Sequence, residues 1–333
     1  MKIAFATPGQ PATGVLVLFA SNGKLLPSGA GIDSASGGAV SRAIDAASFK
    51  TGKGEILELF GLPGVEARRL VIAGVGKAEE LDALGAEAVG AAVAAKLLTS
   101  GEKSITVQNV AAGELSRIDP AAFAARFALG SVLRSYRYDR YLTKQPEGKK
   151  PTLEEVTLIV ADKTAAEAAF APLAALGDAV NFVRDLVTAP GNVIYPASYA
   201  EEIRKLEKFG VEVEVLDVAA MEKLGMGALL AVGQGSINEP RLVVMQWKGA
   251  DAESEPVAFV GKGVTFDTGG ISLKPGLGME EMKYDMAGSA AVVGLMQVLA
   301  ARRAKVNAVG VVALVENMPS HKAQRPGDIV KSM

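Results

Sequence analysis

Two lysines and two aspartates lie close together in the C-terminal half of the sequence. Lys262, Asp267, Lys274 and Asp285 fall within 24 positions. The segment 261–275 reads GKGVTFDTGGISLKP, and the glycines after Asp267 can adopt the positive φ of a tight backbone reversal. Such a reversal would bring the two later side chains back toward the two earlier ones. We therefore expect one cluster of two amines and two carboxylates.

The position of this cluster follows from the apolar run before it. Residues 257–260 predict a strand that ends where the segment GKGVTFDTGG, with Lys262 as its second residue, begins. In open α/β sheets, ligands bind at the carboxyl ends of the strands, so Lys262 is in a place where a site is expected. The cluster should lie at the carboxyl edge of a sheet, just before the N-terminus of a helix.

Two interpretations of these four residues are open at this point. They could form two surface ion pairs, each worth at most about 1 kcal/mol and without function. Alternatively, two carboxylates in a glycine-lined pocket could bind Mn²⁺, Mg²⁺ or Zn²⁺, and a nearby cation favours the neutral amine form of a lysine, which can also be a ligand. The glycines beside the cluster favour the second interpretation, but the residues alone do not decide between them.

Composition limits the chemistry further. The chain has 333 residues, no cysteine and one histidine, His321, so disulfides, thiolate nucleophiles and sulfur-bound zinc are excluded, and a site with two imidazoles cannot form within one chain. With a formal charge of −2, the chain has no excess of positive charge to attract nucleic acid, so we do not expect nucleic-acid binding. The N-terminus, MKIAFATPGQPATG, lacks a long apolar core, and we expect no stretch to approach the roughly 20 apolar residues that span a bilayer. These features predict a soluble cytoplasmic protein.

Short apolar runs alternate with alanine-rich helical stretches along the chain, which predicts an α/β fold. We expect two domains, 1–165 and 166–333, each with a mainly parallel or mixed sheet flanked by helices. The charged segment 144–151 should be a surface loop. Expected strands are 70–75, 156–161, 211–216, 241–247, 257–260 and 306–315; expected helices are 78–100, 164–186, 218–224 and 287–303.

Three other features have simpler explanations. The sequence GVGK at 74–77 lacks the rest of a phosphate-binding motif and predicts a strand-to-helix turn. The three glycines in 226–236 could mark a close approach to a ligand or a turn-rich connection. His321 lies in a polar loop and is expected to be a solvated surface residue.

The string VGKGVTFDTGGISLKP, followed by MKYDMAGSAAVVG, resembles the leucyl aminopeptidase (cytosol aminopeptidase) family. The resemblance is strong over 130–333 and weak before it. It implies that Lys262 and Asp285 bind one metal ion, that Asp267 is shared by two, that Lys274 is the catalytic lysine and that Met282 lines the pocket for the first substrate side chain. Supporting stretches are RDLVTAP (184–190), GMGALLAVGQGS (225–236), PRLVVMQWKG (240–249) and ALVENMPS (313–320).

The resemblance also implies an activity and its requirements. The activity is the release of N-terminal, leucine-like residues from peptides. It requires two divalent ions (Mn or Zn) and, in the intact protein, a bicarbonate base. The intact protein is expected to form a homo-hexamer. In the family, a motif of the form Asn-Thr-Asp-Ala-Glu-Gly-Arg supplies two more metal carboxylates and the arginine that holds bicarbonate, and this chain ends at Met333 before it. We therefore expect an incomplete catalytic domain and poor activity of this chain alone. The alternative is a non-catalytic binding or DNA-associated member of the family.

Overall fold

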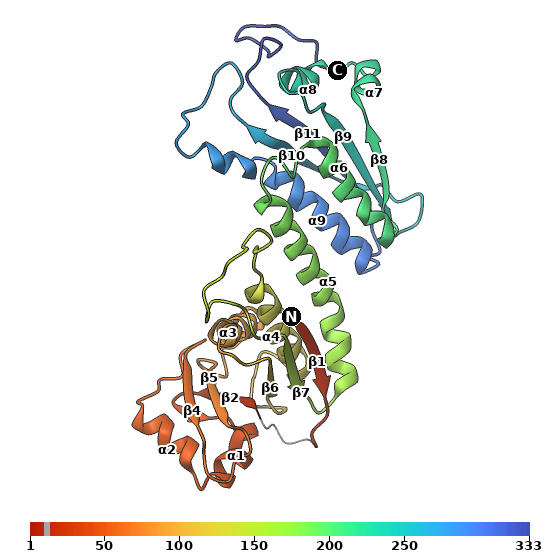
Figure 1. The fold of residues 1–333 in the computed structure, drawn as a ribbon. Coiled ribbons are helices and arrows are strands. Elements are labelled where there is room, and N and C mark those ends of the chain that lie inside the picture. The colour runs from red at the N-terminus through yellow and green to blue at the C-terminus, as the bar shows by residue number, and fades with distance from the viewer. Residues whose placement is uncertain (10–13) are drawn as a thin grey trace. The chain divides into compact units, whose positions relative to one another are not determined.

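The computed structural model describes residues 1–9 and 14–333 (Figure 1). The chain divides into two compact units, Met1–Gly177 and Asp178–Met333, and the division falls inside helix α5 (Lys163–Thr188). Each unit has its own sheet flanked by helices, which confirms the expected α/β class and two-domain organisation. The boundary at 165/166 stays a prediction.

The first unit is built on a mixed sheet with the order β1-β7-β6-β2-β5-β4, and β3 pairs with β2. All neighbours are parallel except the β4–β5 and β2–β3 pairs. Its described strands are β1 (Lys2–Ala6), β2 (Val15–Ser21), β3 (Lys24–Leu25), β4 (Ile56–Phe60), β5 (Arg69–Gly74), β6 (Ser104–Gln108) and β7 (Glu155–Ile159). Its described helices, besides the first part of α5, are η1 (Pro27–Gly29), α1 (Ala30–Ala35), α2 (Ala39–Ala46), α3 (Ala83–Leu97) and α4 (Pro120–Ser135).

Strand β2, VLVLFAS, is buried along its whole length because both faces of the sheet are covered there. On one face, Phe19 packs edge-on against Phe123 and Phe127 of α4, within a cluster that also includes residues of α3. On the other, Leu18 packs in a second cluster with Ile44 of α2. A continuous apolar run is the pattern expected for such a doubly covered strand.

The second unit has a mixed sheet with the order β10-β11-β9-β8, in which only β10 and β11 are parallel. Helices α6 and α9 lie side by side against this sheet (Figure 1). The strands are β8 (Glu212–Leu216), β9 (Arg241–Lys248), β10 (Val257–Asp267) and β11 (Asn307–Asn317). The described helices, besides the end of α5, are α6 (Pro196–Arg204), η2 (Lys205–Phe209), α7 (Val218–Lys223), α8 (Gly227–Gly233), η3 (Met279–Tyr284) and α9 (Ala287–Ala301).

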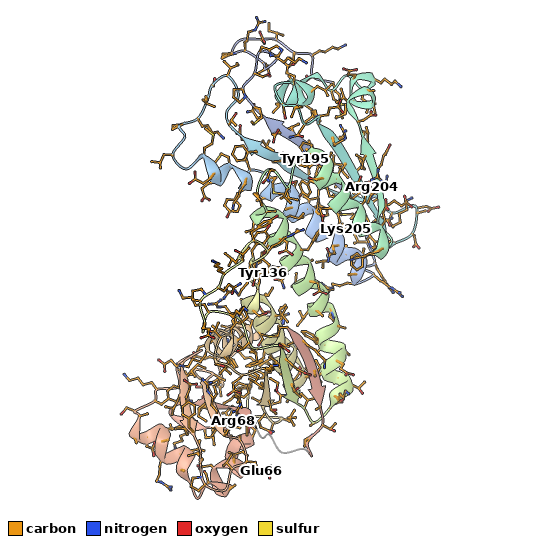
Figure 2. All side chains as sticks on the ribbon, viewed as in Figure 1. Glu66, Arg68, Tyr136, Tyr195, Arg204 and Lys205 are labelled. Carbon is orange, nitrogen blue, oxygen red and sulfur yellow. The ribbon has the colours of Figure 1, made fainter. Side chains whose placement is uncertain are left out.

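The N-terminus of helix α6 is fixed by a local hydrogen bond. Tyr195 precedes its first residue, Pro196, and the backbone N–H of Tyr195 donates to Ser198 Oγ at 3.0 Å. Figure 2 labels Tyr195 at this end of α6 and Arg204 and Lys205 at the other. Proline at the first position is favoured because its missing N–H would have no partner within the helix.

Two expectations about individual elements were wrong. The strand predicted at 257–260 continues to Asp267, so Lys262 lies within β10 and not after it. The helix predicted at 78–100 begins only at Ala83, where Asp82 accepts a hydrogen bond from Gly85 N–H and caps the helix. A capping aspartate is a strong start signal, and the residues before it form a turn.

Among the described residues, two helical segments, Lys163–Thr188 and Met279–Ala301, are long and apolar enough to cross a membrane by length and composition. The expectation that no stretch approaches this length and hydropathy was therefore wrong. A core helix of a water-soluble protein meets the same criterion, and 56 % of the most apolar window of the second segment is buried within the protein. The criterion alone is thus weak evidence for a membrane span.

Candidate functional site

A β-bulge in β10 determines which side chains share a face of the sheet. Lys262 pairs with Ala313 and Val264 with Val315, but the register then shifts, so that Phe266 pairs with Glu316 and Asp267 with Asn317. Thr265 is the additional residue, and its Oγ1 donates to the carbonyl of Val315 at 3.2 Å.

The bulge changes the orientation of Asp267. Side chains five positions apart in a regular strand point to opposite faces, because the side-chain period is two. The partners of Lys262 and Asp267 on β11 are four positions apart, at Ala313 and Asn317, so the two site residues face the same side. Bulges often re-aim side chains in this way next to functional sites.

The carboxylate of Asp267 is held on both oxygens. Oδ1 accepts from the backbone N–H of Gly269 at 2.9 Å and from Nδ2 of Asn317 at 2.7 Å, and Oδ2 accepts from Nζ of Lys274 at 2.6 Å. Burial alone would raise the pKa of Asp267, but these three hydrogen bonds and the Lys274 charge lower it below its ordinary value. Asp267 is therefore a carboxylate held in its charged form.

The reversal after Asp267 brings Lys274 back as expected. Gly269 and Gly270 have φ of +89° and +65°, a left-handed conformation that other residues rarely adopt, and Lys274 N–H donates to the carbonyl of Thr268 at 2.9 Å. Lys274 Nζ also lies 3.0 Å from Sδ of Met282 in η3. The predicted catalytic lysine and the predicted pocket residue are thus in direct contact.

Lys262 and Asp285 form the second ion pair of the site. Asp285 follows η3, and its N–H donates to the carbonyl of Met282 at 3.3 Å. It comes two residues before α9, whose first turn packs closely on β10: a Cβ added to Gly261 would lie 2.5 Å from Cα of Ser289. The close approach of strand and helix keeps Lys262, the residue after Gly261, beside Asp285.

The structure therefore joins all five predicted site residues by contacts. These run from Asp267 to Lys274, from Lys274 to Met282, through the backbone from Met282 to Asp285, and from Asp285 to Lys262. Asn317 was not predicted as a site residue. It lies within ALVENMPS, two residues beyond the strand predicted at 306–315, and nothing in that position indicated a role in the site.

The donor set is compatible with a divalent cation. Oδ2 of Asp285 is buried without a hydrogen-bond partner, and a buried unpaired carboxylate oxygen is unfavourable unless something such as a cation satisfies it. Carboxylate oxygens suit Mn²⁺ and also bind Zn²⁺. Within the described part of the chain, no group of three or more His, Cys, Asp or Glu side chains is arranged to bind a metal, so a site built from these residues would also use lysine amines.

The remaining sequence features do not join this cluster. His321 is exposed, in agreement with its interpretation as a surface residue. The 74–77 segment forms a turn in which Ser21 Oγ donates to the carbonyl of Gly76 and accepts from Ala78 N–H. In the 226–236 segment, Gly227–Gly233 form α8, and Ser236, which follows this helix, donates to the nearly buried carboxylate of Glu316 on β11.

Comparison with known proteins gives the same assignment over both units. Models of the cytosol aminopeptidase family match residues 15–145 for its N-terminal domain and 181–333 for its catalytic domain. A relative from Caulobacter vibrioides, named "Probable cytosol aminopeptidase", is 46 % identical over 324 residues, which cover 97 % of this chain and 64 % of the relative. The chain spans about 64 to 66 % of the length of the first such relatives.

Two solved structures share the fold. The bottromycin maturation enzyme BotP in complex with Mn has a TM-score of 0.78 and 31 % identity, and the match covers 97 % of this chain and 63 % of that one. A mutant of tomato leucine aminopeptidase has a TM-score of 0.81 and 28 % identity, with coverage of 100 % and 66 %. With both domain models matching in order, this chain belongs to the cytosol aminopeptidase family.

Proposed function

We propose that the protein carrying this sequence is a metal-dependent aminopeptidase that releases N-terminal residues, preferentially leucine-like, from peptides. The observation that carries the proposal is the arrangement along the C-terminal half of β10 and in the segment that follows it. A charged carboxylate, an unpaired carboxylate oxygen and two lysines lie in one chain of contacts. Membership of the cytosol aminopeptidase family supports peptide hydrolysis as the reaction of this arrangement.

In this proposal, Lys262, Asp267 and Asp285 hold two divalent ions, either Mn²⁺ or Zn²⁺. The Mn bound by BotP supports the choice of Mn. When bound, such ions polarise a carbonyl oxygen and lower the pKa of a bound water. Nζ of Lys262 would be a nitrogen ligand, and Asp285 would use its Oδ2, which has no hydrogen-bond partner among the described residues.

Lys274 acts as an electrostatic donor. Its ammonium group carries three protons, and the contacts with Asp267 Oδ2 and Met282 Sδ use two of them. The third N–H can donate a hydrogen bond to the oxygen of the scissile carbonyl as negative charge develops on that oxygen. Because Asp267 and Met282 already fix the position of Nζ, little reorganisation is needed when the charge appears.

Met282 and the family assignment support the substrate preference. A methionine side chain is apolar and adaptable, so it suits a pocket for a leucine-like residue next to Lys274. We further propose a cytoplasmic location, a homo-hexamer and a bicarbonate base for the whole protein. These rest on the family resemblance.

A hydrolysis assay on leucine p-nitroanilide with added Mn²⁺ or Zn²⁺ tests the proposal in the whole protein. Removal of one oxyanion donor lowers kcat by about 10²- to 10³-fold in other enzymes, and we expect the same for Lys274→Ala. The matched control is Lys248→Ala, which breaks a surface ion pair with Glu212 of the same 2.6 Å length and should leave kcat unchanged. Absence of metal-dependent hydrolysis, or equal kcat in the two variants, would contradict the proposal.

A further inference from the structure

Asn317 holds the turn that follows Asp267 at several points. It is the last residue of β11 and pairs with Asp267, the last residue of β10. Its backbone carbonyl accepts from the N–H of Thr268 at 3.0 Å and from Oγ1 of Thr268 at 2.8 Å. Its side-chain Nδ2 donates to Oδ1 of Asp267 at 2.7 Å. One residue therefore fixes both the backbone of the turn and the carboxylate before it.

The contact from Nδ2 distinguishes the two oxygens of Asp267. Oδ1 accepts from two neutral donors, Asn317 and the Gly269 N–H, which use both of its lone pairs, whereas Oδ2 accepts from Lys274 alone and keeps a second lone pair. Rotation of the carboxylate about its Cβ–Cγ bond would break these hydrogen bonds together. Oδ2 is thus the oxygen presented toward the other site residues.

An amide suits this position better than a charged donor. A second ammonium or a guanidinium beside Asp267 would repel a divalent cation bound to the same carboxylate. An amide N–H orients the carboxylate without adding positive charge. The nearby Gly270 makes room for the amide, since an added Cβ there would lie 2.8 Å from Oδ1 of Asn317.

We propose that Asn317 is a positioning residue of the metal site, which orients Asp267 so that Oδ2 is available to the cation. The inference rests on the proposed function. Partners that orient metal ligands in this way typically contribute 10- to 100-fold to metal affinity, whereas a purely structural asparagine contributes to folding alone. Metal affinity measured without substrate can therefore separate the two roles.

The chain offers a matched control at the other end of the same strand. Asn307, the first residue of β11, also donates through Nδ2, but its acceptors are the backbone carbonyls of Asp251 and Ser254 in a loop. Asn307→Ala therefore removes an equivalent amide from the same strand without touching the site.

The experiment measures Mn²⁺ binding by titration calorimetry in the whole protein, together with thermal unfolding of the metal-free form. For Asn317→Ala and for Asn317→Leu, which keeps the size of the side chain, we expect Mn²⁺ affinity about 10- to 100-fold below wild type. Asn307→Ala should bind Mn²⁺ as wild type does. Wild-type affinity in both Asn317 variants would overturn the inference, and so would an equal loss in Asn307→Ala or loss of the fold in both Asn317 variants.

The result also separates this inference from the proposed function. If wild type binds Mn²⁺ and hydrolyses the substrate while the Asn317 variants bind equally well, only the positioning role fails. If wild type neither binds Mn²⁺ nor hydrolyses leucine p-nitroanilide, the proposed function fails and the inference fails with it.

Discussion

We expect that a methyl group added at Gly261 would move Lys262 on β10 away from Asp285, which precedes α9. A Cβ built at this residue would lie 2.5 Å from Cα of Ser289 and 2.9 Å from the carbonyl oxygen of Gly288, both in the backbone of α9. Neither atom belongs to a flexible side chain, so strand and helix must move apart. Overpacking of this kind typically costs about 1 to 3 kcal/mol. The movement would also shift Asp285, which precedes α9, away from Lys262.

We expect Gly261→Ala to lower the Tm of the second unit by roughly 2 to 12 °C, since 1 kcal/mol corresponds to about 2 to 4 °C in a unit of this size. Mn²⁺ affinity should fall as well. Differential scanning calorimetry of the metal-free protein measures the first effect and a Mn²⁺ titration the second. The movement of the backbone predicts that both effects occur together.

Gly288→Ala is the control, because it adds the same methyl group to the facing residue of the same contact. Its Cβ would have no neighbour closer than 3.4 Å, and alanine is favoured over glycine inside a helix by about 0.5 to 1 kcal/mol. We therefore expect unchanged or slightly raised Tm. An unchanged Tm in Gly261→Ala, or an equal loss in both variants, would refute the packing argument.

Two further predictions concern the charges and the buried hydroxyls of the second unit. The pKa of Asp267 is lowered in the folded protein, so its stabilising contribution is present above its unfolded pKa near 3.8 and is lost as pH falls through the lower folded value. In urea unfolding of the metal-free protein, wild type should lose stability relative to Lys274→Met below about pH 4, and parallel pH profiles would contradict this. Tyr199 of α6 is fully buried, and its hydroxyl lies 3.0 Å from Ser289 Oγ, which itself donates to the Met286 carbonyl. Tyr199→Phe should lower the free energy of unfolding by about 0.5 to 1.5 kcal/mol and Ser289→Ala by about 1 to 3 kcal/mol. The second loss is larger because it leaves the buried Tyr199 hydroxyl without its partner. Thermal unfolding of both variants measures the losses, and the reverse order would contradict the prediction.

Much of the fold could be predicted because the hydrophobic pattern depends on local burial. The runs at 70–75, 211–216 and 241–247 all lie in strands of the structure, with ends shifted by one residue. The pairing of strands in the sheet was harder to predict from the sequence. Nothing local in 241–247 shows that this strand runs antiparallel to both of its neighbours, because pairing depends on contacts with residues far away in the sequence.

The site could be predicted in its residue types but not in its geometry. The glycines at 269 and 270 indicated a reversal, and the reversal is present. The end of β10 could not be located, because the glycines at 261 and 263 weaken the strand pattern although both are buried under neighbouring backbone and side chains. Asn317 could not be identified because its role depends on pairing with Asp267, 50 positions earlier in the chain.

The bulge at Thr265 explains why the spacing of Lys262 and Asp267 was misleading. Five positions place two side chains of a regular strand on opposite faces, so a strand that reached Asp267 would have argued against a shared site. The predicted strand stopped at 260, so both residues were expected in a loop, where the alternation of side chains does not apply. In the structure both residues belong to the strand. The register shift between Val264 and Phe266 places Lys262 and Asp267 on the same side of it. The backbone of a parallel strand pair, and not a loop, then sets the separation of the two side chains, and strands hold side chains more precisely than loops do.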